Sequence, residues 1–377
     1  MLLPLCAPFW PSLRSCLAQC NWCHSRTCDL APSAAPPREW TCAFTAAAAY
    51  LRALMCTSAS CPVRAVQCLT ERLATPLWLW RCQNRQEPSD VRVSPLGGGP
   101  PLGGGPGQPP GEWLWCGGGC DPSVLPPLRV VLYVHGGAFA LCSPSTHRGI
   151  TLGLLQALER GAGNAAVFAV AYRQPPAHPH PAPADDVLAA YAFLAALEPR
   201  PAIVLAGDSS GGALVVEALL RIRDGGVLPA PAGAICLSPW CDLEEEAAGS
   251  WEENKGVDYV PAAGVRRYAE AYAGGKALRD VSIAGADLRG LPKLLVVAGE
   301  KEVLLGQISR FVASARTAGV TVEFRVESGM CHVWYAFSML ATAEQEKEWY
   351  GRLGAFAAAR FSEREEADET GAMQKLV

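Results

Sequence analysis

The feature that most constrains the fold is a short apolar run that leads directly into a glycine-flanked serine turn and then a helix. Residues 202–206 have the composition of a buried strand, and residues 213–223, rich in Ala, Leu and Val, that of a helix. Between them lies Gly207-Asp208-Ser209-Ser210-Gly211-Gly212. A sharp strand-to-helix turn can hold a serine hydroxyl exposed beside a base, and glycines permit such a turn. Ser209 is therefore the candidate nucleophile, with a structural or phosphate-binding turn as the alternative.

The chain after residue 112 alternates apolar runs with helical stretches. Strands are predicted at residues 112–116, 129–134, 166–171, 202–206, 234–237, 294–298 and 321–326. Helices are predicted at residues 150–160, 184–197, 211–223, 307–318 and 343–360. Apolar strands separated by helices predict an α/β fold in which helices flank a mostly parallel central sheet. Residues 244–280 contain one predicted helix and no strand, and we interpret them as an insertion above the sheet.

Composition excludes some partners. Half of the 377 residues are hydrophobic, 18% are charged, and the formal net charge is -4. This charge offers no basic surface for nucleic acid, so we expect no nucleic-acid partner. We also expect no transmembrane span, because no apolar run reaches about 18 residues. A homodimer is one assembly that the sequence allows.

The chain divides into segments of different character. Residues 1–38, with three arginines and a single acid, predict a disordered or targeting leader of the organelle transit-peptide type, so the expected compartment is an organelle or the cytoplasm. Residues 39–82 have helical spacing, and residues 83–111 are a Gly/Pro-rich linker. Residues 112–362 form the predicted catalytic domain, followed by a charged tail at 363–377.

Ten of the 16 cysteines lie before residue 83. A zinc-like spacing occurs within the predicted leader, at Cys16, Cys20, Cys23, His24 and Cys28. No second Cys-x-x-Cys pair follows at the distance that zinc fingers or ribbons require. We therefore expect free cysteines, no metal site and no cofactor.

A second glycine turn follows the predicted strand at residues 129–134. It reads His135-Gly136-Gly137-Ala138-Phe139. Turns at the carboxyl ends of parallel strands meet at one edge of a sheet. Acyl transfer needs donors for the oxygen that becomes negatively charged. We predict that the backbone N–H groups of Gly136, Gly137 and Ser210 form this oxyanion hole, and that the His135 ring orders the loop.

A base and an acid complete the candidate site. Of the six histidines, His332 alone follows the last predicted strand, so its loop returns to the edge that carries Ser209. A carboxylate that orients this imidazole is expected after the strand at residues 294–298. Glu300 and Glu302 both fit, and a tight turn after Gly299 favours Glu302. The order serine, acid, histidine is that of an α/β-hydrolase.

With these motifs, residues 113–356 resemble the hormone-sensitive-lipase-like branch of the α/β-hydrolases, a group of carboxylesterases and lipases. Two further motifs carry the resemblance: Tyr172-Arg173 followed by Pro176-Ala177-His178-Pro179, and Leu237-Ser238-Pro239-Trp240-Cys241-Asp242-Leu243. Three sites depart from the family pattern. Ala138 replaces a common third glycine, Glu302 replaces the commoner aspartate, and Arg173-Gln174-Pro175-Pro176 replaces the usual Arg-Leu-Ala-Pro.

The resemblance implies a triad of Ser209, Glu302 and His332, and a helical cap built from N-terminal helices and the insertion. The implied function is hydrolysis of small-molecule carboxylic esters with small or medium acyl chains through an acyl-enzyme. Two alternatives remain: an amidase or deacetylase with the same triad, and a relative that binds ligands without catalysis.

Overall fold

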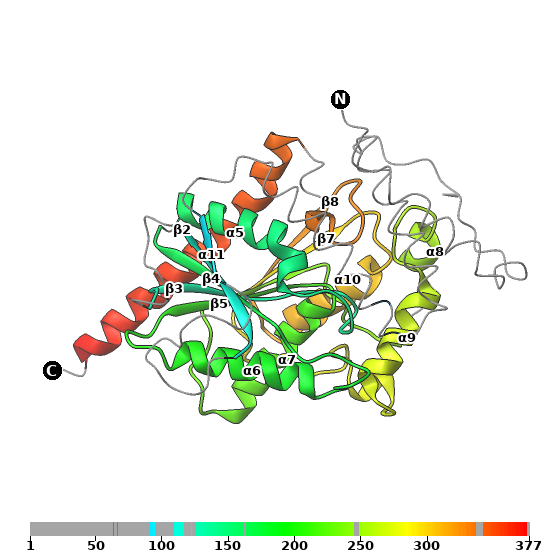
Figure 1. Cartoon of the computed structure of the whole chain (residues 1–377), viewed down its shortest axis with the longest axis horizontal. Helices are drawn as coiled ribbons and strands as arrows, with labels where there is room; N and C mark the ends of the chain where they lie inside the picture. The colour runs from blue at the N-terminus through cyan, green and yellow to red at the C-terminus, as the bar shows by residue number, and fades with distance from the viewer. Residues whose placement is uncertain are drawn as a thin grey trace, which may run out of the picture.

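The computed structural model describes the chain in several stretches (Figure 1): residues 63, 66, 91–94, 109–116, 122, 126–161, 163–244, 249–336 and 342–374. The predicted leader with its cysteine cluster, and most of the predicted N-terminal helices, lie outside these residues. Val63 and Val66 are helical and buried in the hydrophobic core.

One eight-stranded sheet, in the order β1-β2-β4-β3-β5-β6-β7-β8, forms the centre of the described structure. Its strands are β1 (Val91–Val93), β2 (Gly111–Cys116), β3 (Arg129–Val134), β4 (Ala165–Val170), β5 (Ala202–Asp208), β6 (Gly233–Leu237), β7 (Leu294–Gly299) and β8 (Val322–Glu327). The pairs of β2 with β1 and with β4 are antiparallel, and the other neighbours are parallel. The predicted mostly parallel sheet is confirmed.

Helices cover both faces of the sheet (Figure 1). One face packs against α5 (Arg148–Gly161) and α11 (Ala343–Gln374), and the other against α6 (Ala182–Ala195), α7 (Ser210–Gly225) and α10 (Leu305–Thr317). Successive strand side chains point to opposite faces, so Val131 and Tyr133 join the first core, while Leu132 joins the second. Because both of their faces are buried, β4, β6 and β7 contain no charged residue, whereas the edge strand β8 alternates charged and apolar residues.

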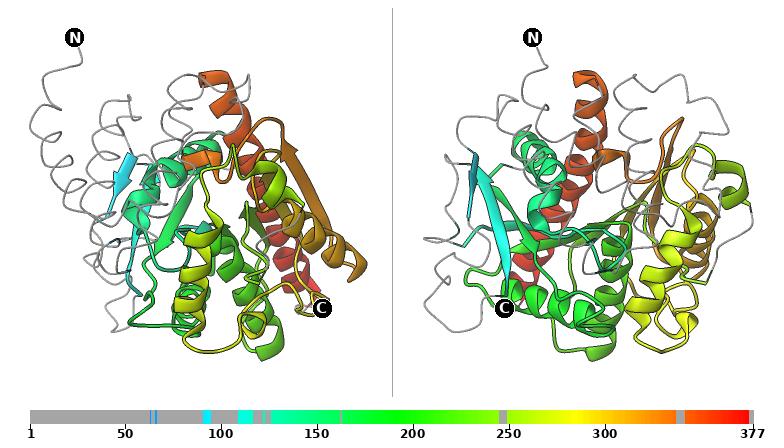
Figure 2. Two further views of the ribbon diagram at one scale, coloured as in Figure 1. Left: turned by 90° about the vertical axis from the view of Figure 1, so that its right-hand side faces the viewer. Right: turned by 45° about the vertical axis from the view of Figure 1, so that its right-hand side comes forward.

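The insertion lies between β6 and β7. It contains α8 (Ser250–Asn254), α9 (Ala262–Ala273) and the short 3-10 helix η3 (Leu278–Asp280). A further 3-10 helix, η2 (Pro144–His147), precedes α5. Figures 1 and 2 show α8 and α9, in yellow-green to yellow, at the end of the molecule that carries β7, β8 and α10. The expected interruption of the strand and helix alternation is present there.

Two predicted boundaries differ from the structure. The segment expected to be a linker contains β1, which pairs with β2; a three-residue strand is too short to show a pattern by itself. The segment expected to be a charged tail continues α11 to Gln374. This extension is held by contacts with the sheet body, because Glu365 accepts two hydrogen bonds from Arg129, at 2.8 and 2.9 Å.

Among the described helices, none combines the length and the apolar composition that crossing a bilayer requires.

Candidate active site

The predicted site residues meet at the carboxyl edge of the sheet. Ser209 lies between β5 and α7, and the glycine loop at 135–139 follows β3. Glu302 follows β7, and His332 follows β8. Parallel neighbouring strands end at one edge, so residues far apart in sequence become neighbours in space.

Ser209 occupies a strained turn. Its φ of 52° lies in the left-handed region, which is rare for a side chain other than glycine. The main chain holds it there, since the Ser209 N–H donates to the Leu237 carbonyl (2.8 Å) and its carbonyl accepts from the Trp240 N–H (3.0 Å). A Cβ at Gly211 would collide with the Val134 carbonyl. The turn therefore requires glycine there and leaves Ser209 partly exposed.

His332 faces Ser209 on one side and Glu302 on the other. Its Nε2 is 2.9 Å from the Ser209 Oγ, and its Nδ1 is 3.6 Å from the Glu302 Oε2. His332 is 4% exposed and Glu302 is 0% exposed. Burial lowers the pKa of His332, but the carboxylates of Glu302 and, to a smaller extent, Asp258 and Asp208 raise it, so the pKa lies above its usual value of 6.5. The imidazole can therefore accept and hold a proton.

Glu300 points away from the imidazole. Its carboxylate accepts the Gly329 N–H (2.8 Å) and the Ser328 hydroxyl (2.9 Å). The Gly329 hydrogen bond, with others, lowers the pKa of Glu300 to about 2. Of the two candidate acids, the structure brings only Glu302 to the base, while Glu300 ties its own loop to the β8 loop.

Gly136 is not available as an oxyanion donor. Its N–H donates to Asp208 Oδ1 (2.9 Å), which also accepts the Tyr133 hydroxyl (2.6 Å). His147 Nε2 lies 3.3 Å from the other carboxylate oxygen. Burial would raise the pKa of Asp208, but His147 and these hydrogen bonds lower it overall. This ionised, buried Asp208 anchors the start of the glycine loop, which corrects the expectation for Gly136.

The rest of the loop leaves two N–H groups open. The Phe139 N–H donates to the Ser210 Oγ (2.9 Å), and the N–H groups of residues 140–141 donate to the Gly137 carbonyl. Within the described part of the chain, the backbone N–H groups of Gly137, Ala138 and Ser210 donate no hydrogen bond. Ala138 has a φ of 51°, and this left-handed conformation turns the chain at the site. Of the three predicted donors, Gly137 and Ser210 have open N–H groups, and Ala138 is open in place of Gly136.

The His135 ring belongs to the loop architecture, as expected. It stacks on Tyr172 with ring centroids 4.3 Å apart, and its Nδ1 lies 2.8 Å from the Gly136 carbonyl. Burial lowers the pKa of His135 to about 3, so the ring is neutral. It does not face Ser209 as a base.

Aromatic side chains from the insertion and the loop meet beside the site. Phe139 stacks on Tyr272 of α9 with centroids 3.8 Å apart and lies 5.6 Å from Trp240. Tyr259, also from the insertion, lies 6.0 Å from the His332 ring. The insertion therefore contributes an apolar wall next to the base and the glycine loop.

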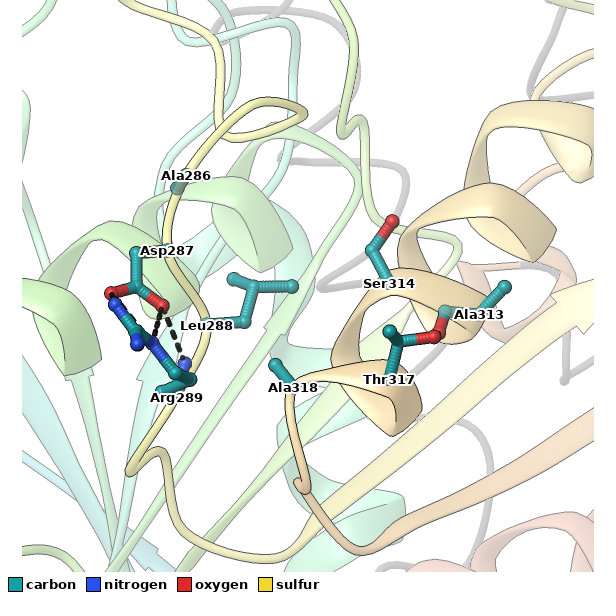
Figure 3. Close-up of a pocket in the computed structure, with 8 residues that line it drawn as sticks. All are labelled: Ala286, Asp287, Leu288, Arg289, Ala313, Ser314, Thr317 and Ala318. Carbon is teal, nitrogen blue, oxygen red and sulfur yellow. Dashed lines mark hydrogen bonds and ion pairs between the residues drawn. The ribbon is translucent and has the colours of Figure 1, made fainter.

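The hollow in Figure 3 lies elsewhere. It measures about 400 Å³ and is lined by Ala286, Asp287, Leu288, Arg289, Ala313, Ser314, Thr317 and Ala318. Since α10 begins near the end of β7 and ends just before β8, these residues lie at the amino ends of the strands. The hollow is open to solvent, and none of the candidate site residues lines it.

Three residues at the site escaped the sequence predictions. In the sequence, Ala138 stands out only as a replacement of a common glycine. Asp208 directly precedes the nucleophile at the end of an apolar strand, which is the pattern of a buried acid. Asp258, in the insertion, accepts the N–H groups of Val303 (2.8 Å) and His332 (3.3 Å). Its apolar neighbours along the chain were the only available signal.

Within the described residues, no group of three or more His, Cys, Asp and Glu side chains could hold a metal ion. The cysteine cluster of the predicted leader lies outside those residues.

Comparison with known proteins places the chain in a family. Residues 131–336 match the model of the α/β hydrolase fold family. An acetyl-hydrolase of Streptomyces hygroscopicus is 41% identical over 238 residues, which cover 61% of this chain and 77% of the relative. An esterase of Acinetobacter venetianus is 32% identical over 224 residues, which cover 56% of this chain and 68% of the relative.

Solved structures agree. An esterase from the bacterial hormone-sensitive lipase family is 31% identical, superposes with a TM-score of 0.67, and is matched over 83% of this chain and 97% of its own. EstE5, in crystals soaked with p-nitrophenyl butyrate, is 28% identical with a TM-score of 0.66, over 83% and 98% of the two chains. The chain belongs to the α/β-hydrolase fold family, as one of its ester-cleaving hydrolases similar to hormone-sensitive lipase.

Proposed function

We propose that the chain hydrolyses carboxylic esters with small or medium acyl groups through a triad of Ser209, His332 and Glu302. The observation that carries this proposal is the 2.9 Å contact between Ser209 Oγ and His332 Nε2. With Nε2 accepting from the hydroxyl, the Nδ1 proton faces Glu302. The buried carboxylate then stabilises the positive charge that His332 acquires.

The proposed reaction has two halves. His332 takes the Ser209 proton as Oγ attacks the ester carbonyl, and it then gives the proton to the departing alcohol. Water attacks the resulting acyl-enzyme in the same way and releases the acid. In both halves the carbonyl oxygen becomes negative, and the open N–H groups of Gly137, Ala138 and Ser210 are the proposed donors.

Two observations support a short acyl group. The 41% identical relative is named an acetyl-hydrolase. The aromatic wall is also tightly packed, because Phe139 and Tyr272 stack beside the glycine loop and both side chains are almost fully buried. An acyl chain long enough to reach these rings would have to displace them.

Hydrolysis of p-nitrophenyl esters tests the proposed function. We expect the purified chain to cleave the acetate and butyrate with higher kcat/KM than the decanoate. Because only neutral His332 can accept the Ser209 proton, kcat/KM should rise with pH, with its midpoint above 6.5. Failure to cleave either short ester would refute the function, and a preference for decanoate would refute the acyl size. Cleavage of p-nitroacetanilide at a comparable rate would favour an amidase.

A further inference from the structure

Side chains of the insertion form hydrogen bonds with the main chain of the loop that carries Glu302. Ser250 Oγ of α8 donates to the Val303 carbonyl (2.7 Å) and accepts the Gly306 N–H (2.9 Å). Asn254 Nδ2, at the end of α8, donates to the Glu302 carbonyl (3.0 Å). These bonds fix the main chain at Glu302 and in the four residues that follow it. The insertion therefore supports the acid loop as well as contributing a wall beside the site.

Asp258, which follows α8, connects this loop to the loop of His332. Its Oδ2 accepts the Val303 N–H (2.8 Å), and its Oδ1 accepts the N–H groups of His332 (3.3 Å) and Tyr259 (2.8 Å). The side chain is 1% exposed. Val303 directly follows Glu302. One buried carboxylate thus holds the main chain of both the candidate acid and the candidate base.

The same carboxylate places negative charge next to the base. Among the described residues, the titratable groups that face Asp258 are His332, Glu302, Tyr259 and Cys331. Burial raises the pKa of Asp258 to about 6, although His332 and the N–H donors oppose this. Asp258 is therefore mostly ionised over the range above 6.5 in which His332 titrates. Together with Glu302 and Asp208, its charge raises the pKa of His332 against the effect of burial.

We propose that Asp258 is a positioning residue for this ester hydrolysis: its carboxylate fixes the acid and base loops relative to each other, and its charge stabilises protonated His332. The inference rests on the proposed function of the triad. Asp258 exchanges no proton with the substrate and touches no reacting atom. It acts through the backbone N–H of His332 and through its electric field, which is strong in a buried site.

The variant Asp258→Asn separates this role from packing, because Asn has nearly the same shape but no charge. In Asn an NH2 group replaces one of the two carboxylate oxygens. One of the main-chain N–H groups that donate to Asp258 therefore loses its acceptor. We expect kcat/KM for p-nitrophenyl acetate to fall about ten- to a hundredfold, as for other lost hydrogen bonds to a charged group. The rising limb of the pH profile should move to lower pH, since removing a negative charge lowers the pKa of His332.

Two further variants serve as controls. Asp258→Glu keeps the charge but displaces the oxygens, so its rate should fall while the pH limb stays near that of the wild type. Asp287→Asn removes a carboxylate at the opposite edge of the sheet. It should leave the rate and the position of the pH limb unchanged. An Asp258→Asn enzyme with an unmoved pH limb, whatever its rate, would overturn the proposal. A wild-type rate in Asp258→Glu would also overturn the proposal. This second test remains informative if the Asp258→Asn variant does not fold.

Titration of His332 by NMR tests the charge effect without turnover. Followed in the Ser209→Ala background, the imidazole should titrate at lower pH when Asp258→Asn is added, and equal titration curves would contradict the proposal. If wild-type protein cleaves no ester, the proposed function fails by itself, whereas the NMR comparison still decides whether Asp258 acts on His332.

Discussion

Replacing Ser209 with Ala should lower kcat/KM for p-nitrophenyl acetate by about four to six orders of magnitude. Among the described residues, the Ser209 hydroxyl is the nucleophile candidate that contacts His332 Nε2, at 2.9 Å, so its removal eliminates the acyl-enzyme route. Residual hydrolysis would come from water held near the open N–H donors. The rate is measured with purified variant and wild type under identical conditions.

The matched control is Ser314→Ala. Ser314 lines the hollow at the opposite edge of the sheet and is exposed, so this variant should retain wild-type activity. Circular dichroism should show that both variants keep the wild-type fold. An active Ser209→Ala protein would mean that another residue performs the attack.

The second large effect is expected for Glu302→Gln, which should lower kcat by about four orders of magnitude. A neutral amide cannot stabilise the imidazolium, and it can orient the ring in the wrong tautomer. Because the Glu302 carboxylate raises the pKa of His332, any remaining activity should also show its rising limb at lower pH.

Glu300→Gln is the control, because Glu300 lies two residues before Glu302 on the same loop. Glu300 binds Ser328 and Gly329 and does not face the imidazole, so we expect activity within about threefold of the wild type, as for a surface change. The opposite pattern, an inactive Glu300→Gln and an active Glu302→Gln, would contradict the proposed triad.

Much of this architecture could be predicted from the sequence. The strand around residues 202–206 was recognisable because a strand buried on both faces is apolar throughout, and the same holds for β4 and β7 and for β3 after Arg129. The direction of the strands then followed from the helices between them. Strand β1 could not be recognised, because three residues become a strand only through pairing with β2.

The finer features of the site depend on backbone geometry that composition does not determine. Gly136 and Ala138 differ in their suitability as donors because Asp208, 72 residues from Gly136, occupies the Gly136 N–H. The left-handed φ of Ala138 was also not predictable, since alanine rarely adopts it. Glycine-rich composition located the loop, and long-range hydrogen bonds decide which of its N–H groups stay open.

The role of Asp258 could not be predicted from the sequence either. It lies 74 residues before His332 in an insertion without a strand pattern, so no local spacing connects it to the triad. Glu302 was easier to identify, because its position after β7 restricted the candidates to two carboxylates. A residue that acts through main-chain N–H groups carries no motif of its own.

Covalent labelling of Ser209 tests the central claim most directly. The wild-type protein is incubated with a fluorophosphonate, which reacts with activated serines, and the adduct is located by tandem mass spectrometry. We expect a single adduct on Ser209, loss of ester hydrolysis in proportion to labelling, and no adduct in Ser209→Ala. An ester-cleaving protein whose Ser209 stays unmodified while another residue carries the label would contradict the account.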